Sequence, residues 1–247
     1  MTQFAHDKVV PYQDSKLNKK QQVAEMFNSI AFRYDFLNRF LTAGIDVRWR
    51  KKAIMLLKNI QPQIMLDVAT GTGDVALLSY ELLHPKKIVG IDISEGMLQI
   101  GRQKVAKAKL EHVIELVSGD SETIHYPNDT FDAITVAFGV RNFENLEKGL
   151  AEMLRVLKPG GKLVVLEFSK PKNIVFRAMC SFYEKVIVPF AGKWFAGNKS
   201  AYSYLNRSAK AFPERKQFTG ILQNVGYKNT RYKPLSLGIC CMYRADK

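Results

Sequence analysis

The sequence contains few residues that could form disulfides or bind metals. Three cysteines (Cys180, Cys240 and Cys241) occur in 247 residues, and their spacing fits neither a zinc site nor a disulfide framework. This cysteine usage is typical of an intracellular chain, so we expect a cytoplasmic protein. No metal site is predicted either, because the histidines are scattered along the chain: His6, His84, His112 and His125.

Long apolar runs are also lacking. No uncharged apolar stretch reaches the ~18 residues that a membrane-spanning helix needs. The first 18 residues are polar and contain no apolar core of a signal peptide. With 47% hydrophobic and 24% charged residues, the composition is that of a globular protein of one large domain, with or without an appendage.

Acidic residues are scarce relative to basic ones. The chain has 23 Asp and Glu against 37 Lys and Arg, which gives a formal net charge of +14. A charge of this sign and size attracts polyanions, which include nucleic acids and anionic membrane surfaces.

A glycine-containing stretch at residues 64–74 organises the chain. It begins as a buried strand, continues as a small-residue turn, and is followed by a helical pattern. Gly71 and Gly73 let the backbone turn sharply and approach a ligand closely, although their spacing also fits a loose dinucleotide fingerprint. The flanking carboxylates, Asp67 and Asp74, would repel a pyrophosphate. They favour a ligand with a positive end and no phosphate, such as S-adenosylmethionine.

From residue 64 strands and helices alternate, which predicts a parallel sheet with helices on both faces. Asp92 ends the second strand, where a carboxylate suits ribose hydroxyls. Asp120 follows the third strand and suits an adenine amino group, with the next backbone N–H near the ring. The alternative is that such acids are only polar strand ends. The expected strands lie near 64–69, 87–92, 113–117, 132–138 and 162–168, and the helices near 74–83, 95–109 and 145–157.

Outside this core, residues 1–60 are expected to form an N-terminal helical arm and cap, and residues 61–247 the main domain, with a helical lid at about 170–212. In the first part, 1–18 is predicted as a loose arm, 19–41 and 49–57 as helices, and the cationic stretch 48–52 as a solvated face. The basic, aromatic stretch 174–197 is either packed helix or a membrane-surface lid. Residues 218–225 indicate a last helix, and 228–232 with 238–244 an antiparallel hairpin.

The residues singled out so far resemble the class I S-adenosylmethionine-dependent methyltransferases. Within them, the blocks at 26–38, 138–142, 154–161 and 166–171 are similar to those of the quinone-biosynthesis C-methyltransferases, and the resemblance covers about residues 22–240. It implies a Rossmann-like α/β fold with a mostly parallel seven-stranded sheet, a C-terminal antiparallel hairpin, N-terminal helices and a helical insertion after the fifth strand. The chain departs from the family pattern at four positions: Asn28, Ala137, Arg207 and Ala209.

The resemblance also implies an activity, the C-methylation of a prenylated hydroquinone. Demethylmenaquinol is the expected substrate, and the corresponding ubiquinone precursor is the alternative. Arg141, in the loop after the fourth strand, is expected to stabilise a phenolate, unless it only forms a surface salt bridge. Tyr34 is a second, weaker candidate for contact with the ring. The expected cofactor-binding residues are Asp67, Gly71, Thr72, Gly73, Asp92, Asp120 and Ser121.

Two rival classes remain. An RNA methyltransferase would suit the positive charge, but the loop after the fourth strand lacks the Asn/Asp-Pro-Pro-aromatic motif of amino-methylating enzymes. A non-enzymatic membrane-associated module is disfavoured by the complete set of cofactor acids. We therefore expect no nucleic-acid partner, a peripheral and electrostatic contact with a membrane surface, and leave an oligomer open.

Overall fold

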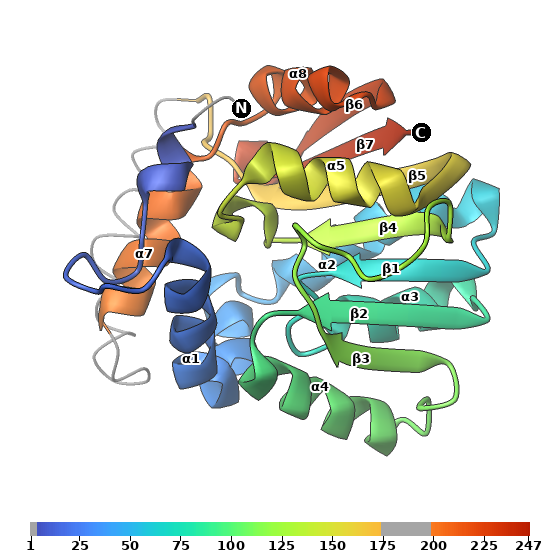
Figure 1. Ribbon diagram of the computed structural model, residues 1–247, viewed down its shortest axis with the longest axis horizontal. Coiled ribbons are helices and arrows are strands. Elements are labelled where there is room, and N and C mark those ends of the chain that lie inside the picture. Colours follow the sequence, from blue (N-terminus) through green and yellow to red (C-terminus); the bar gives the residue numbers. More distant parts are fainter. Residues whose placement is uncertain (1–3, 174–198) are drawn as a thin grey trace.

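The computed structural model describes residues 4–173 and 199–247, and their centre is a mixed seven-stranded sheet (Figure 1). Its strand order is β3-β2-β1-β4-β5-β7-β6. The first five strands run parallel, and β7 is antiparallel to both of its neighbours. The strands are β1 (Ile64–Val68), β2 (Lys87–Asp92), β3 (Ile114–Ser118), β4 (Phe131–Ala137), β5 (Leu157–Phe168), β6 (Lys228–Leu235) and β7 (Cys240–Asp246).

Helices cover both faces of the sheet because its central strands are apolar on both sides. Leu66 and Val68 of β1 face a cluster that includes α5 (Leu146–Val156) and α8 (Lys216–Val225). Met65, one position along, faces the opposite cluster with α2 (Ile45–Ile54), α3 (Asp74–Leu83) and α4 (Glu95–Lys107). This alternation follows the two-residue period of a strand.

Two further helices, α1 (Lys19–Leu41) and α7 (Lys199–Ala211), lie beyond the carboxyl ends of the parallel strands (Figure 1). A capping box starts α1: Asn18 accepts from the Gln21 N–H at 2.9 Å, and the Gln21 side chain accepts from the Asn18 N–H at 3.2 Å. Met26 of α1, Met97 of α4 and Tyr204 of α7 share one small apolar cluster. The short helices are η1 (Ala5–Lys8), η2 (Met55–Ile60), η3 (Val140–Asn142) and η4 (Ser236–Gly238).

The predicted fold class is confirmed, including the antiparallel C-terminal hairpin, but two local predictions are wrong. Residues 4–18 do not form a loose arm, because η1 forms and the His6 ring is buried against Phe212, with 5.5 Å between ring centroids. Residues 48–52 are not a uniformly solvated face, because Trp49 and Arg50 are buried. Trp49 packs on β5 and donates to the Ser236 hydroxyl at 2.8 Å, a contact across 187 residues.

The stretch 174–197, predicted as packed helix or membrane-surface lid, lies outside the described residues. The described remainder of the predicted lid at about 170–212 contains the helix α7. Within residues 4–173 and 199–247, none of the helices has the length and hydropathy of a membrane-spanning segment.

Candidate active site

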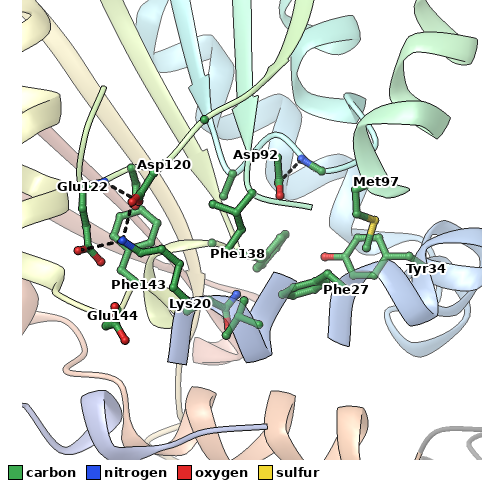
Figure 2. A pocket seen from close by; sticks show the side chains of 18 residues that line it. Lys20, Phe27, Tyr34, Asp92, Met97, Asp120, Glu122, Phe138, Phe143 and Glu144 are labelled. Atoms are coloured by element: carbon green, nitrogen blue, oxygen red, sulfur yellow. Dashed lines mark hydrogen bonds and ion pairs between the residues drawn. The ribbon is translucent and has the colours of Figure 1, made fainter. Parts of the chain in front are cut away.

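A pocket opens at the carboxyl edge of the sheet, where β1, β2, β3 and β4 end and α1 crosses above them (Figure 2). The space inside it, with its open mouth included, is about 650 Å³. Acidic side chains line this pocket, among them Asp92, Asp120 and Glu122. Aromatic side chains line it as well, and in Figure 2 Phe138 lies between Asp120 and Asp92.

Asp92 and Gly71, two predicted cofactor residues, meet in this pocket. The Asp92 carboxylate accepts from the Gly71 N–H and from the Ser94 N–H, both at 2.8 Å. Burial raises the pKa of Asp92, and these backbone N–H groups oppose the rise. Gly71 has a φ of +57°, and a Cβ there would meet no other group, so the turn needs glycine for its backbone conformation. The carboxylate therefore joins the glycine turn to the start of α4.

Asp120 and Ser121, predicted near the adenine, also line the pocket. The Asp120 carboxylate is not free there, because the Lys20 ammonium of α1 lies 2.5 Å from it and 3.3 Å from Glu122 (Figure 2). The pairing places one turn of α1 directly over the predicted adenine site. The sequence offered no sign of it, since Lys20 and Asp120 are 100 residues apart.

Three other predicted cofactor residues do not line the pocket. Asp67 is buried below it and accepts from the hydroxyls of Thr70 at 2.6 Å and Thr135 at 2.7 Å. Desolvation raises the pKa of Asp67 to about 6. Thr72 donates to Asp35 of α1 at 2.7 Å, and Gly73 has a φ of +76° at the N-cap of α3. These contacts shape the glycine turn, so direct contact of the three with a cofactor stays a prediction.

The sequence suggested that the negative charge of Asp74 attracts the positive end of the ligand, but in the structure basic side chains of the protein itself neutralise this charge. Arg50 of α2 lies 3.0 Å from its carboxylate and Lys104 of α4 lies 2.7 Å from it. These cations hold the pKa of Asp74 below its usual value, although burial acts in the opposite direction. The carboxylate therefore ties α2 and α4 to the start of α3.

Tyr34 lines the pocket, as its predicted contact with the substrate ring requires. Its ring packs edge-to-face on Phe27, with 5.8 Å between centroids, and lies beside Met97 in Figure 2. Burial raises the pKa of the Tyr34 phenol, so the group is neutral at physiological pH.

Arg141 lies just behind the pocket wall. The neighbouring Gly139 and Asn142 line the pocket, whereas Arg141 is only 4% exposed and pairs through Nη1 with the carboxylate of Glu167. Its guanidinium also lies 5.3 Å from the centre of the Phe168 ring. The alternative of a surface salt bridge is therefore wrong in one respect, because this ion pair is buried.

Residues 15–247 match the model of the ubiE/COQ5 methyltransferase family. The chain belongs to this family. It is 45% identical over 244 residues to demethylmenaquinone methyltransferase of Bacteroides fragilis, covering 99% of both chains. It is 43% identical over 230 residues to the ubiquinone/menaquinone biosynthesis C-methyltransferase UbiE of Geobacter sulfurreducens, covering 93% of this chain and 90% of the relative.

Solved structures agree with this family in their fold. A methyltransferase from Thermotoga maritima, described as a possible histamine N-methyltransferase, aligns with a TM-score of 0.60 over 91% of this chain and 99% of its own length, at 18% identity. The predicted family, the Rossmann-like fold and a methyltransferase activity are thus confirmed.

The pocket suits S-adenosylmethionine, the methyl donor expected for this family. Carboxylates at the ends of β2 and β3 match ribose hydroxyls and an adenine amino group, and Ile93 and Met97 supply an apolar wall beside Asp92. Within residues 4–173 and 199–247, no three His, Cys, Asp or Glu side chains are grouped to hold a metal ion.

Proposed function

We propose that this protein transfers a methyl group from S-adenosylmethionine to a ring carbon of a prenylated hydroquinone, and that demethylmenaquinol is its substrate. The near full-length relative from Bacteroides fragilis supports the substrate class. The observation that carries the proposal is that the carboxylate of Asp92 and the aromatic rings of Phe27 and Phe138 line a single cavity. Asp92 binds the cofactor, and the aromatic rings pack against the flat quinol ring.

The residues around the pocket divide the work. S-adenosylmethionine, when bound, supplies an activated methyl group, so the chain must orient the reactants and favour the nucleophilic form of the ring. Asp92 holds ribose hydroxyls, and Tyr34 packs against the quinol ring. A ring carbon attacks well only after a neighbouring hydroxyl has lost its proton to solvent. The new bond would join this carbon to the methyl carbon, the electron pair of the broken sulfur–methyl bond would stay on sulfur, and the ring C–H proton would pass to solvent, which restores aromaticity.

Arg141 is proposed to stabilise the negative charge on the quinol oxygen. Its location behind Gly139 and Asn142 supports this role, and so does its Nε–H, which is buried and has no hydrogen-bond partner within residues 4–173 and 199–247. A buried donor without a partner costs ~1–3 kcal/mol, and a substrate oxygen would remove this cost. A small shift of the η3 turn or of the side chain must bring the two groups into contact.

The test of this role is single-turnover methylation of a short-tailed demethylmenaquinol by Arg141→Ala. Loss of one preorganised donor lowers the rate ~100- to 1000-fold, while the affinity for S-adenosylmethionine stays the same. Arg141→Lys should restore little, because an ammonium does not reproduce a planar guanidinium. The matched control is Arg102→Ala, which removes a half-exposed arginine of α4. A rate within threefold of wild type would remove Arg141 from the mechanism and make Tyr34 the residue to test.

We further propose that the protein works at the cytoplasmic face of a membrane, bound peripherally. A prenylated substrate is dissolved in lipid, and the net charge of +14 favours an anionic surface. Exposed apolar side chains support this, since Phe32 of α1 is 92% exposed and Leu237 of η4 is 72% exposed.

A further inference from the structure

Glu167 lies at the end of β5 and is fully buried, and its carboxylate contacts Arg141. It accepts from Nη1 of Arg141, from the Arg141 backbone N–H at 3.5 Å and from the Phe168 backbone N–H at 2.9 Å. Phe168 closes the other side by placing its ring against the guanidinium. The arginine is therefore held by a carboxylate and by a ring from two neighbouring positions of one strand.

Among residues 4–173 and 199–247, the groups that face this pair include four neutral side chains and one arginine. The neutral side chains are Tyr34 of α1, Tyr204 of α7, and Cys240 and Tyr243 of β7, and burial raises the pKa of each of them. Arg207 of α7 also acts on the Tyr204 phenol. Within the described part of the chain, the carboxylate of Glu167 is the negative charge paired with the Arg141 guanidinium, and burial raises its own pKa although Arg141 opposes the rise.

A bare guanidinium and a paired one act differently on a nearby oxygen. A bare buried cation strongly favours an anion beside it, whereas a cation with a carboxylate in contact presents a weaker, dipolar field. The pairing also prevents the large penalty of an isolated buried charge. The same contact therefore fixes where the arginine lies and reduces how strongly it attracts negative charge.

We propose that Glu167 is a positioning residue that holds Arg141 in place and limits its positive field, so that it sets the pH at which the quinol hydroxyl ionises in the site. This inference rests on the proposed function, in which Arg141 stabilises the quinol oxygen. Glu167 touches neither the cofactor nor the reacting atoms in this scheme, and it acts through Arg141.

The experiment measures the single-turnover rate against pH for wild type, Glu167→Gln, Glu167→Asp and Arg141→Ala, with short-tailed demethylmenaquinol and saturating S-adenosylmethionine. The rate rises with pH as the quinol ionises. In Glu167→Gln the cation is no longer neutralised, so the rising limb should move down by about 1 pH unit, at the lower end of what a nearby opposite charge causes. In Arg141→Ala the limb should move up. A residue that served only folding would lower the amount of active enzyme without moving the limb.

Glu167→Asp separates position from charge. It keeps the carboxylate but shortens the side chain by one methylene, so the limb should stay near its wild-type pH while the maximal rate falls roughly 10- to 100-fold through misplacement of the arginine. Cofactor affinity and thermal unfolding, measured on each variant, establish that folded enzyme is compared.

Each outcome is decisive. If Arg141→Ala moves the limb but Glu167→Gln does not, the inference about Glu167 is wrong and the role of Arg141 stands. If Glu167→Asp has the wild-type rate, the positioning role is wrong even where Glu167→Gln cannot be purified folded. If Arg141→Ala changes neither rate nor limb, the proposed function of Arg141 fails first.

Discussion

Replacing Asp92 is the most direct test of the cofactor site, because this carboxylate has a structural role and a proposed binding role. Its two oxygens accept from Gly71 and Ser94 at 2.8 Å each, and it also lines the pocket. Asp92→Ala would remove all of these interactions. Asp92→Asn keeps one acceptor oxygen but directs its amide N–H₂ at a backbone donor and removes the charge.

The expected loss of affinity comes from the ribose contact. A hydrogen bond to a charged group contributes ~1.5–3 kcal/mol, which corresponds to a roughly 10- to 150-fold higher dissociation constant for S-adenosylmethionine. The free energy of unfolding should fall as well, by ~1–3 kcal/mol for each buried N–H left without a partner. Asp92→Ala should therefore unfold at a lower denaturant concentration than Asp92→Asn.

Isothermal titration calorimetry with S-adenosylmethionine measures the affinity, and urea unfolding establishes the folded fraction. Asp129→Asn is the control, since it makes the same change in charge at a half-exposed carboxylate that pairs with Lys247 at 2.6 Å, far from the carboxyl edge. Affinity of folded Asp92→Asn within twofold of wild type would refute the assignment of this strand end to the ribose.

Three other predictions concern charge. The folded-state pKa of Asp67, about 6, lies above its unfolded value, so the free energy of unfolding of the wild type should fall as the pH rises from about 4 to about 6. Asp67→Asn should remove this fall and be more stable than wild type at pH 8 by up to about 3 kcal/mol. Urea unfolding at pH 4 and pH 8 measures this, and an unchanged pH dependence in the variant would contradict it. The Asn28 side-chain oxygen accepts from the Ser94 hydroxyl and from the Gly96 N–H at the start of α4. Asn28→Asp should therefore add ~0.3–1 kcal/mol to the free energy of unfolding through the helix dipole and raise the melting temperature by a few degrees. A melting temperature below that of the wild type would contradict this. Vesicles with anionic lipid should retain the protein at low salt and release it as ionic strength rises, and equal binding to neutral vesicles would argue against electrostatic attachment.

Much of the sheet could be predicted because its strands are apolar on both faces and end in acids. The alternation of apolar strand and helix patterns predicted the position of each parallel strand to within a few residues. The exception is β5, which begins at Leu157 and not near residue 162. Residues 157–161 were thus not expected to belong to that strand. In the structure Leu157 already pairs with Phe131 of β4, and the register shifts between Phe131 and Ala133.

The site could be predicted most readily where one residue type at one position is sufficient, as for an acid at a strand end. Asp92, Gly71 and Asp120 line the pocket as expected. The partners that decide the state of the other acids come from distant helices, since Arg50 reaches Asp74 from α2 and Lys20 reaches Asp120 from α1. A helical stripe shows which face of α1 or α2 is buried, but not which charge it delivers to a loop 24 or 100 residues away.

The position of β7 has a consequence for synthesis of the chain on the ribosome. This strand lies between β5 and β6, and residues 240–243 are buried. Until residues 240–246 have left the exit tunnel, one edge of β5 presents Val164 and Leu166 with unpaired backbone groups, which is a surface prone to aggregation. Trp49 must likewise wait for Ser236, which is synthesised shortly before β7, to form its hydrogen bond. Chaperone dependence during translation, and sensitivity to stop codons placed within the last strand, should therefore be greater than the length of the chain alone implies.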